Sequence, residues 1–103
     1  MIALITENQA ALDRICKQYH VRRFELFGSA LNEARFDSSA SDMDFLVEFL
    51  PLEPGRRADT YFGLREALER LFQRRVDLVV TKAIKNPYFL QVIDRERELL
   101  YAA

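Results

Sequence analysis

Several features that mark disulfide-bonded, membrane-bound or nucleic-acid-binding proteins are scarce in this sequence. Its single cysteine cannot form a disulfide within the chain. There is no signal peptide and no apolar run of membrane-spanning length, so we expect a cytoplasmic protein without membrane contact. The 15 basic residues are balanced by 16 acidic ones, for a net charge of -1. A dedicated nucleic-acid binder would carry a basic excess, so we expect no direct contact with nucleic acid.

The lone cysteine and the lone histidine are poor candidates for catalysis or zinc binding. An N-terminal helix is predicted from Thr6 and Gln9, which fit a capping box, and from the apolar residues that follow at helical spacing. Cys16 lies on the apolar face and is interpreted as a small buried hydrophobic residue. His20 falls at the C-terminal end of this helix, where a cation is favourable. We therefore expect structural roles for both residues.

The chain is organised around the stretch from Leu26 to Phe49. A strand is predicted from Val21 to Phe27, and it ends at Gly28 and Ser29. This pair would offer an anion free backbone N–H groups, a hydroxyl and room for close approach. A Gly-Ser pair after a strand is, by itself, more often only a turn.

Two carboxylates, Asp42 and Asp44, open the next apolar run. In a strand they share one face, roughly 6 to 7 Å apart along the backbone, and can reach one hard cation such as Mg²⁺ or a pair of them. They can instead simply solvate the start of the strand. The opposite face is predicted to belong to the core and carries Met43, Phe45, Val47 and Phe49.

A third carboxylate, Asp77, interrupts an apolar run predicted to form a strand from about Arg75 to Val80. An ionised carboxylate inside such a run is costly unless it is paired or bound to a metal. Arg74 or Arg75 could pair with it, and the local sequence does not decide between the two explanations. The presence of Asp42 and Asp44 favours the metal.

The remaining pattern completes a small α/β domain, with helices against a mixed sheet, that we expect to span residues 1–103 as one unit. A short helix is predicted from Ala30 to about Ala34, and a last helix from Tyr88 to Glu98. A longer helix is predicted between them, capped by Asp59 or Thr60. Its inner face is predicted to be core and carries Tyr61, Leu64, Leu68, Leu71 and Phe72.

The order of Gly28-Ser29, Asp42-x-Asp44 and Asp77 resembles the signature of the minimal nucleotidyltransferases (MNT) of the DNA polymerase beta-like superfamily. That signature is Gly-Ser, a loop, Asp-x-Asp entering an apolar strand, and a third Asp on a later strand. The resemblance covers almost the whole chain. Two departures stand out: the loop of residues 30–41 is slightly longer than usual, and the arginine that many relatives carry shortly after the serine is missing.

The resemblance implies the polymerase beta-like nucleotidyltransferase fold, in which the three aspartates converge at one edge of the sheet. Asp42, Asp44 and Asp77 would then be catalytic ligands of Mg²⁺, with two ions expected, and Asp77 would also be a candidate general base. Gly28 and Ser29 would hold the β- and γ-phosphates of ATP.

The resemblance also implies a partner, because standalone members of this family are often antitoxins encoded beside a HEPN-domain ribonuclease toxin. The expected reaction is transfer of AMP from ATP to a hydroxyl of that toxin, a tyrosine in such systems, within a hetero-oligomer. The alternative is a non-catalytic binding antitoxin or scaffold with a vestigial nucleotide site. The longer loop and the missing arginine favour this alternative, whereas the three intact aspartates count against it.

Overall fold

The computed structural model describes residues 3–27, 43–80 and 97–103. The described elements, in chain order, are two short N-terminal helices, two strands, a long helix and two further strands: α1 (Ala3–Glu7), α2 (Gln9–Gln18), β1 (Val21–Phe27), β2 (Met43–Phe49), α3 (Arg57–Phe72), β3 (Val76–Val80) and β4 (Arg97–Ala102).

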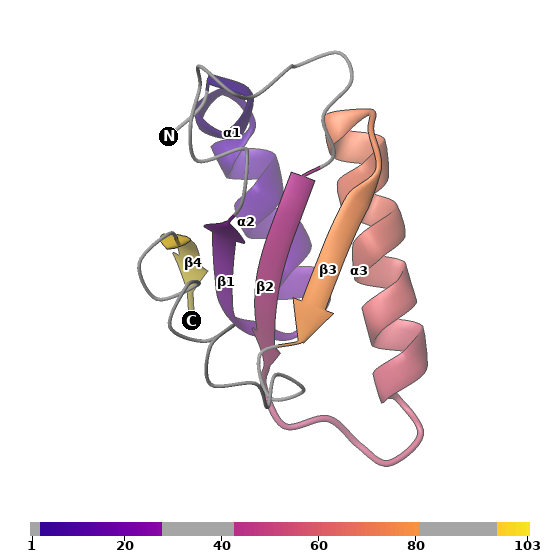
Figure 1. Cartoon of the computed structure of the whole chain (residues 1–103). Helices are drawn as coiled ribbons and strands as arrows, with labels where there is room; N and C mark the ends of the chain where they lie inside the picture. Colours follow the sequence, from indigo (N-terminus) through magenta and orange to yellow (C-terminus); the bar gives the residue numbers. More distant parts are fainter. Residues whose placement is uncertain (1–2, 28–42, 81–96) are drawn as a thin grey trace, which may run out of the picture.

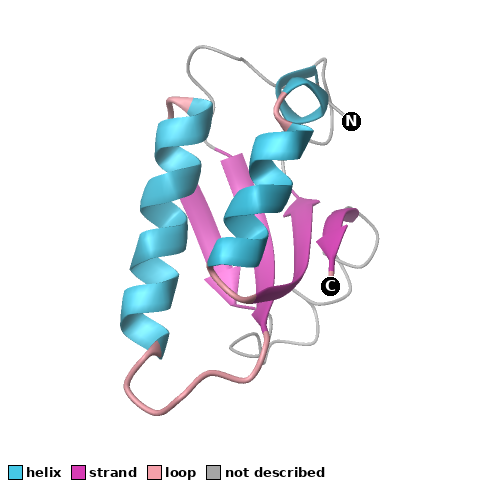
Figure 2. Cartoon of the chain, turned by 180° about the vertical axis from the view of Figure 1, so that it is seen from behind, coloured by secondary structure: helices cyan, strands magenta, loops and turns pink. Residues whose placement is uncertain are grey.

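The four strands form one mixed sheet in the order β3-β2-β1-β4. β1 lies antiparallel to both of its neighbours, β2 and β4, whereas β2 and β3 run parallel. The helices α2 and α3 cover one face of this sheet (Figures 1 and 2). In the chain, α3 connects β2 to β3. It brings the chain back to the end of the sheet where β2 began, so that β3 can run parallel to β2. The predicted fold class, a mixed sheet packed with helices, is confirmed.

The core lies between the sheet and the helices. Phe45 of β2 stacks on Phe24 of β1 and on Phe72 of α3, with ring centroids 4.7 and 5.9 Å apart. The core face predicted for β2 is confirmed at Met43, Phe45 and Val47, which are fully buried, whereas Phe49 is half-buried and Leu46 on the opposite face is buried as well. The helices supply the other side of this core through fully buried apolar side chains: Ile5, Leu12, Cys16, Leu64 and Leu68.

The predicted capping box at the N-terminus is wrong. The helical region is broken at Asn8, which precedes α2 and makes no side-chain capping bond. Thr6 donates its hydroxyl to the carbonyl of Ala3, 3.1 Å away. Gln9 donates to the Asp13 carboxylate at 2.9 Å and to the Leu100 carbonyl of β4 at 3.2 Å. The contact with β4 is tertiary, so the local sequence does not reveal it.

Two further boundaries differ from the sequence prediction. The long helix α3 begins at Arg57, two residues before the predicted cap at Asp59. Residues 97 and 98, assigned to a final helix, instead begin the strand β4, because their backbone pairs with β1. This pairing is a contact between distant parts of the chain, and local periodicity does not report it. The predicted helix of residues 30–34 and the rest of the last helix lie outside the described residues.

The helices in the described part of the chain are either too short or too polar to cross a bilayer.

Candidate active site

Two of the predicted site residues, Asp44 and Asp77, lie side by side in the sheet. They are register partners in the parallel pair of β2 and β3. Neighbouring strands lie about 4.8 Å apart, so the two backbones hold the carboxylates within a few ångströms of each other. Because Phe45 faces the helices, the alternation of the strand places both aspartates on the opposite face of the sheet.

The environment of Asp77 differs from the sequence prediction. Its side chain is exposed, because β3 is an edge strand, and its charge is not buried among the neighbouring valines. Within the described ranges, no ion pair joins Asp77 to Arg74 or Arg75. The prediction that Asp77 is buried and must therefore be paired or bound to a metal is wrong. The case for a metal depends instead on the register of Asp77 with Asp44.

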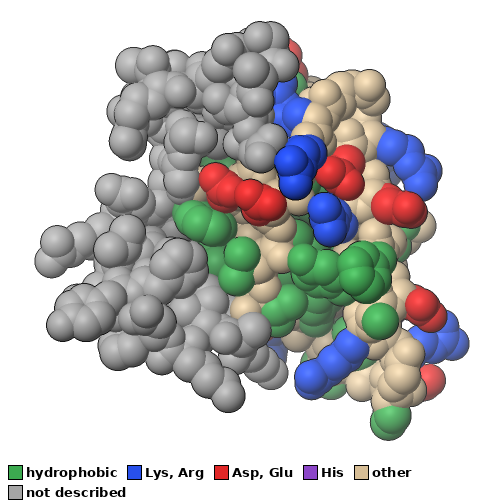
Figure 3. Space-filling model, turned by 45° about the vertical axis from the view of Figure 1, so that its right-hand side comes forward, with side chains coloured by type: hydrophobic (Ala, Val, Ile, Leu, Met, Phe, Trp, Pro, Cys, Tyr) green, Lys and Arg blue, Asp and Glu red, His purple; other side chains and the backbone are tan. Residues whose placement is uncertain are grey.

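The two aspartates line a shallow hollow of about 390 Å³, called here the carboxylate hollow. It extends over the β3 edge of the sheet, and Phe27, Tyr61 and Arg65 also line it. Figure 3, which brings this side of the molecule forward, shows acidic and basic side chains together, with apolar side chains directly beneath them. Phe27 is the register partner of Asp44 on β1, and it immediately precedes Gly28 in the chain.

Helix α3 faces β3 with three polar side chains spaced four residues apart, two of which, Tyr61 and Arg65, line the hollow. The Tyr61 hydroxyl donates to the Leu78 carbonyl at 2.5 Å, and the Glu69 carboxylate accepts from the Val76 N–H at 3.3 Å. Arg65 lies between them, with its Nε 3.8 Å from Glu69. This Nε is buried and has no hydrogen-bond partner in the described structure. Arg65 therefore places a cation in the carboxylate hollow, where its ion pair is with Glu69.

Sequence reasoning missed both Tyr61 and Arg65 as residues of the site. Tyr61 was predicted to be a core residue, and its ring is indeed half-buried, but its hydroxyl lies at the sheet edge. The available signal was the i, i+4, i+8 spacing of Tyr61, Arg65 and Glu69, which puts polar groups along one side of α3.

Glu25 is another carboxylate on the same sheet face, and the structure gives it a different role. It is almost fully buried and pairs in register with Leu46 of β2. Arg23 donates its Nε–H to the Glu25 carboxylate at 2.8 Å. A buried charge that is paired in this way is compensated, which indicates a structural carboxylate.

The remaining predicted site residues, Gly28, Ser29 and Asp42, lie outside the described residues. The described part of the chain contains no cluster of three or more metal-ligating side chains. Two adjacent carboxylates are nevertheless a suitable donor set for a hard cation, because Mg²⁺ is usually held by one or two carboxylates together with substrate phosphates.

Cys16 is excluded as a thiolate ligand or nucleophile. It is fully buried in the core between the sheet and the helices. This burial, with a smaller contribution from the charge of Asp13, raises the pKa of the thiol from 9.0 to about 12. The prediction of a small buried hydrophobic residue is confirmed.

Comparison with known proteins identifies relatives along nearly the whole chain. A family model described as polymerase beta, nucleotidyltransferase matches residues 10–103. Two proteins of Methanocaldococcus jannaschii, MJ0128 and MJ1379, both carry the provisional name protein adenylyltransferase. The first is 38% identical over 86 residues, which cover 82% of this chain and 80% of the relative. The second is 34% identical over 84 residues, which cover 82% and 79%.

Solved structures show the same fold. A structure described provisionally as a minimal nucleotidyltransferase is 29% identical, with a TM-score of 0.71, and the match covers 94% of this chain and 95% of the other. A toxin-antitoxin structure with AMP-PNP matches at 17% identity and a TM-score of 0.68, covering 93% and 74%. A chain in a structure of the tri-AMPylated Shewanella oneidensis HEPN toxin in complex with MNT antitoxin matches at 16% identity and a TM-score of 0.64, and the match covers 95% of this chain and 72% of the other.

Proposed function

Because the chain belongs to the polymerase beta-like nucleotidyltransferase family, we propose that it is a protein adenylyltransferase that transfers AMP from ATP to a hydroxyl of a partner protein. The observation that carries this proposal is the register pairing of Asp44 and Asp77 at the edge of the sheet. The names of the two M. jannaschii relatives support a protein as the acceptor.

The proposed metal ligands are Asp44 and Asp77 together with Asp42, which precedes Met43 in the chain. When bound, two Mg²⁺ ions would neutralise the charge that develops on the triphosphate. Gly28 and Ser29 directly follow Phe27 and would hold the β- and γ-phosphates. Phe27, which immediately precedes Gly28, pairs with Asp44 from the β1 side, and α3 borders Asp77 from the other side.

In the proposed reaction the acceptor oxygen forms a bond to the α-phosphorus of ATP. The bond between that phosphorus and the oxygen bridging to the β-phosphate breaks, and pyrophosphate leaves. The acceptor hydroxyl gives up its proton to Asp77, which is exposed on the open side of β3 and is the proposed general base.

The proposed acceptor is a tyrosine of a HEPN-domain ribonuclease toxin, which this chain would neutralise as its antitoxin in a hetero-oligomeric complex. The two toxin-antitoxin structures of the same fold support this choice of partner. The AMP-PNP in one of them supports ATP as the nucleotide.

Labelled ATP tests the proposed activity. The chain is incubated with Mg²⁺ and the protein encoded by the adjacent reading frame, with ATP labelled either at the α- or at the γ-phosphate. We expect the α-label, but not the γ-label, to remain on the partner. Retention of the γ-label would indicate a kinase. A stable complex that acquires neither label would mean that the chain acts by binding alone.

A further inference from the structure

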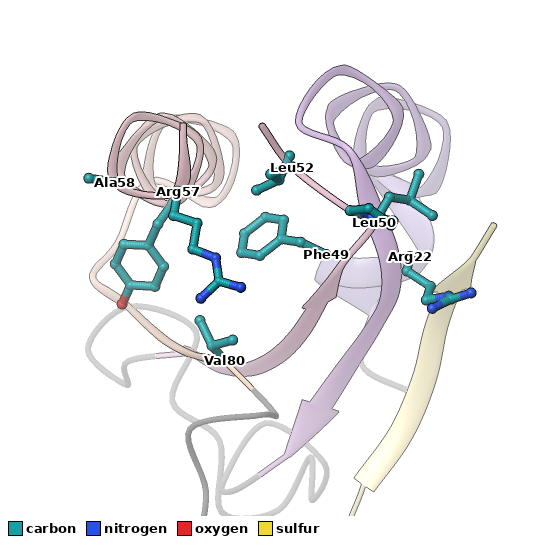
Figure 4. Close-up of a pocket in the computed structure, with 9 residues that line it drawn as sticks. Arg22, Phe49, Leu50, Leu52, Arg57, Ala58 and Val80 are labelled. Atoms are coloured by element: carbon teal, nitrogen blue, oxygen red, sulfur yellow. The ribbon is translucent and has the colours of Figure 1, made fainter. Parts of the chain in front are cut away.

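A second and larger hollow, of about 670 Å³, opens at the opposite end of the parallel strands from the aspartates. It lies where β2 and β3 end and α3 begins, and is called here the Arg57 hollow. Phe49, Leu52 and Val80 supply half-buried apolar walls. Figure 4 shows the guanidinium of Arg57 extending between the ring of Phe49 and Val80, with Leu52 on the far side of that ring.

Among its described lining residues, the charged side chains of this hollow are all basic. Arg57 is exposed, and no described carboxylate forms an ion pair with it. Arg22 stands at the rim beyond Leu50, with its guanidinium pointing away from Arg57 (Figure 4). No acidic side chain is found among the described residues that line the hollow. A ligand that combines an apolar group with an anion therefore matches the site best.

The Arg57 hollow adjoins the carboxylate hollow. Tyr61 lines both hollows, and its hydroxyl is fixed to the backbone of β3 at Leu78. Asp77 and Val80 are three residues apart on that strand, which corresponds to about 10 Å along it, and the alternation of the strand points their side chains to opposite faces of the sheet. Phe62 is 56% exposed and meets the Tyr61 ring edge-on at 5.2 Å, so apolar surface continues outward from the junction.

The edge of β3 itself is partly blocked as a site for strand addition. Glu69 already accepts the Val76 N–H, and Tyr61 already donates to the Leu78 carbonyl. A partner that added a strand here would have to displace the bond from Val76 to Glu69 and share the Leu78 carbonyl with Tyr61. Recognition on this side is therefore expected to use the side chains of the two hollows.

From these observations we propose that the Arg57 hollow docks the segment of the acceptor protein that surrounds its modified hydroxyl. An apolar side chain of that segment packs against Phe49 and Leu52, and a nearby carboxylate binds Arg57. To reach Asp77 from this anchor, the segment passes along about 10 Å of β3 and around its edge, because Val80 and Asp77 point to opposite faces of the sheet. This inference rests on the proposed function, because it specifies the substrate of that activity.

Charge reversal at Arg57 is the first test. Arg57→Glu is expected to raise the KM for the acceptor protein at least tenfold and to leave the KM for ATP unchanged, whereas Arg57→Lys retains most of the affinity. Arg57 is the first residue of α3, where a carboxylate favours the helix, so the reversal leaves the fold intact. Arg14→Glu is the matched control, because Arg14 is exposed on α2 and lines neither hollow.

An unchanged KM for the acceptor in Arg57→Glu would overturn the docking proposal, as would a raised KM for ATP, which would assign the hollow to the nucleotide. Neither result would affect the proposed function, provided that the unaltered chain still transfers the α-label. Absence of transfer by the unaltered chain would instead remove the proposed function.

The bound segment can be mapped by photo-crosslinking. Ala58 lines the hollow and is exposed, so a photo-crosslinking residue is introduced at this position. We expect crosslinks to an acidic, apolar segment within a few residues of the modified hydroxyl. Reversing the charge of the acidic residue in that segment should lower the KM of the Arg57→Glu variant for the acceptor towards that of the unaltered pair. Crosslinks between two copies of this chain, or to a segment remote from the modified residue, would contradict the proposal.

Discussion

Asp44 and Asp77 are held beside each other by the backbone pairing of β2 and β3, and this arrangement does not depend on a loop. The register is fixed at its start by the Met43 N–H, one residue before Asp44, which donates at 3.1 Å to the carbonyl of Arg75, two residues before Asp77. A pair of carboxylates built on neighbouring strands keeps its spacing when a ligand arrives. The proposed metal site therefore has at least two preorganised ligands.

The hydrogen bond between Tyr61 and Leu78 should contribute measurably to stability. Tyr61→Phe keeps the ring but leaves the Leu78 carbonyl without this donor, so we expect a loss of about 1 kcal/mol in the free energy of unfolding. Urea denaturation measures the loss. Tyr101→Phe is the matched control, since no hydrogen bond of the Tyr101 hydroxyl is found in the described structure, and it should change stability little. Equal effects of the two substitutions would show that the Tyr61 bond contributes nothing.

Gly63 allows α3 to approach the ring of Tyr19. A Cβ at Gly63 would lie 2.7 Å from Cε1 of Tyr19. Gly63→Ala gains helix propensity of about 1 kcal/mol but overpacks this contact, and we expect a net destabilisation of about 1 kcal/mol. In a Tyr19→Ala background the same substitution should become stabilising. A double-mutant cycle by thermal or urea unfolding decides the point, and additive effects would refute the contact.

The buried thiol of Cys16 should make stability depend on pH in the alkaline range. Its pKa in the folded protein, about 12, lies above the ordinary value of 9.0. The contribution of the buried, neutral thiol to the free energy of unfolding is therefore complete below pH 9 and is lost as the pH rises from 9 towards 12. At pH 10 the loss is about 1 kcal/mol. The test compares the unfolding free energies of the unaltered chain and Cys16→Ala at pH 8 and pH 10. If the difference in unfolding free energy between the two proteins is the same at pH 8 and pH 10, the raised pKa of Cys16 is contradicted.

The strands around the site were predictable because their signal is local. Alternation in these strands depends only on neighbouring residues. The first appears with its predicted bounds, Val21–Phe27, and the second, predicted to begin at Asp42, is described from Met43 to Phe49. Asp77 was misjudged because an apolar run does not reveal whether its strand is central or at the edge. The strand β4, the polar contacts of Gln9 and the position of Arg65 depend on pairing and packing between distant segments. These features became visible only in the folded chain.

The most direct test of the central claim replaces both aspartates of the carboxylate hollow and measures AMP transfer. Asp44→Asn with Asp77→Asn removes charges that the proposed metal needs, worth several kcal/mol in the transition state, so AMP transfer should fall about a thousandfold or more. The readout is the intact mass of the partner protein after incubation with ATP and Mg²⁺, alongside circular dichroism of the variant. Asp59→Asn, an exposed aspartate of α3, is the control. We predict an added adenylate with the unaltered chain and the control, and none with the folded double variant. An undiminished yield of adenylate from the double variant would contradict the account.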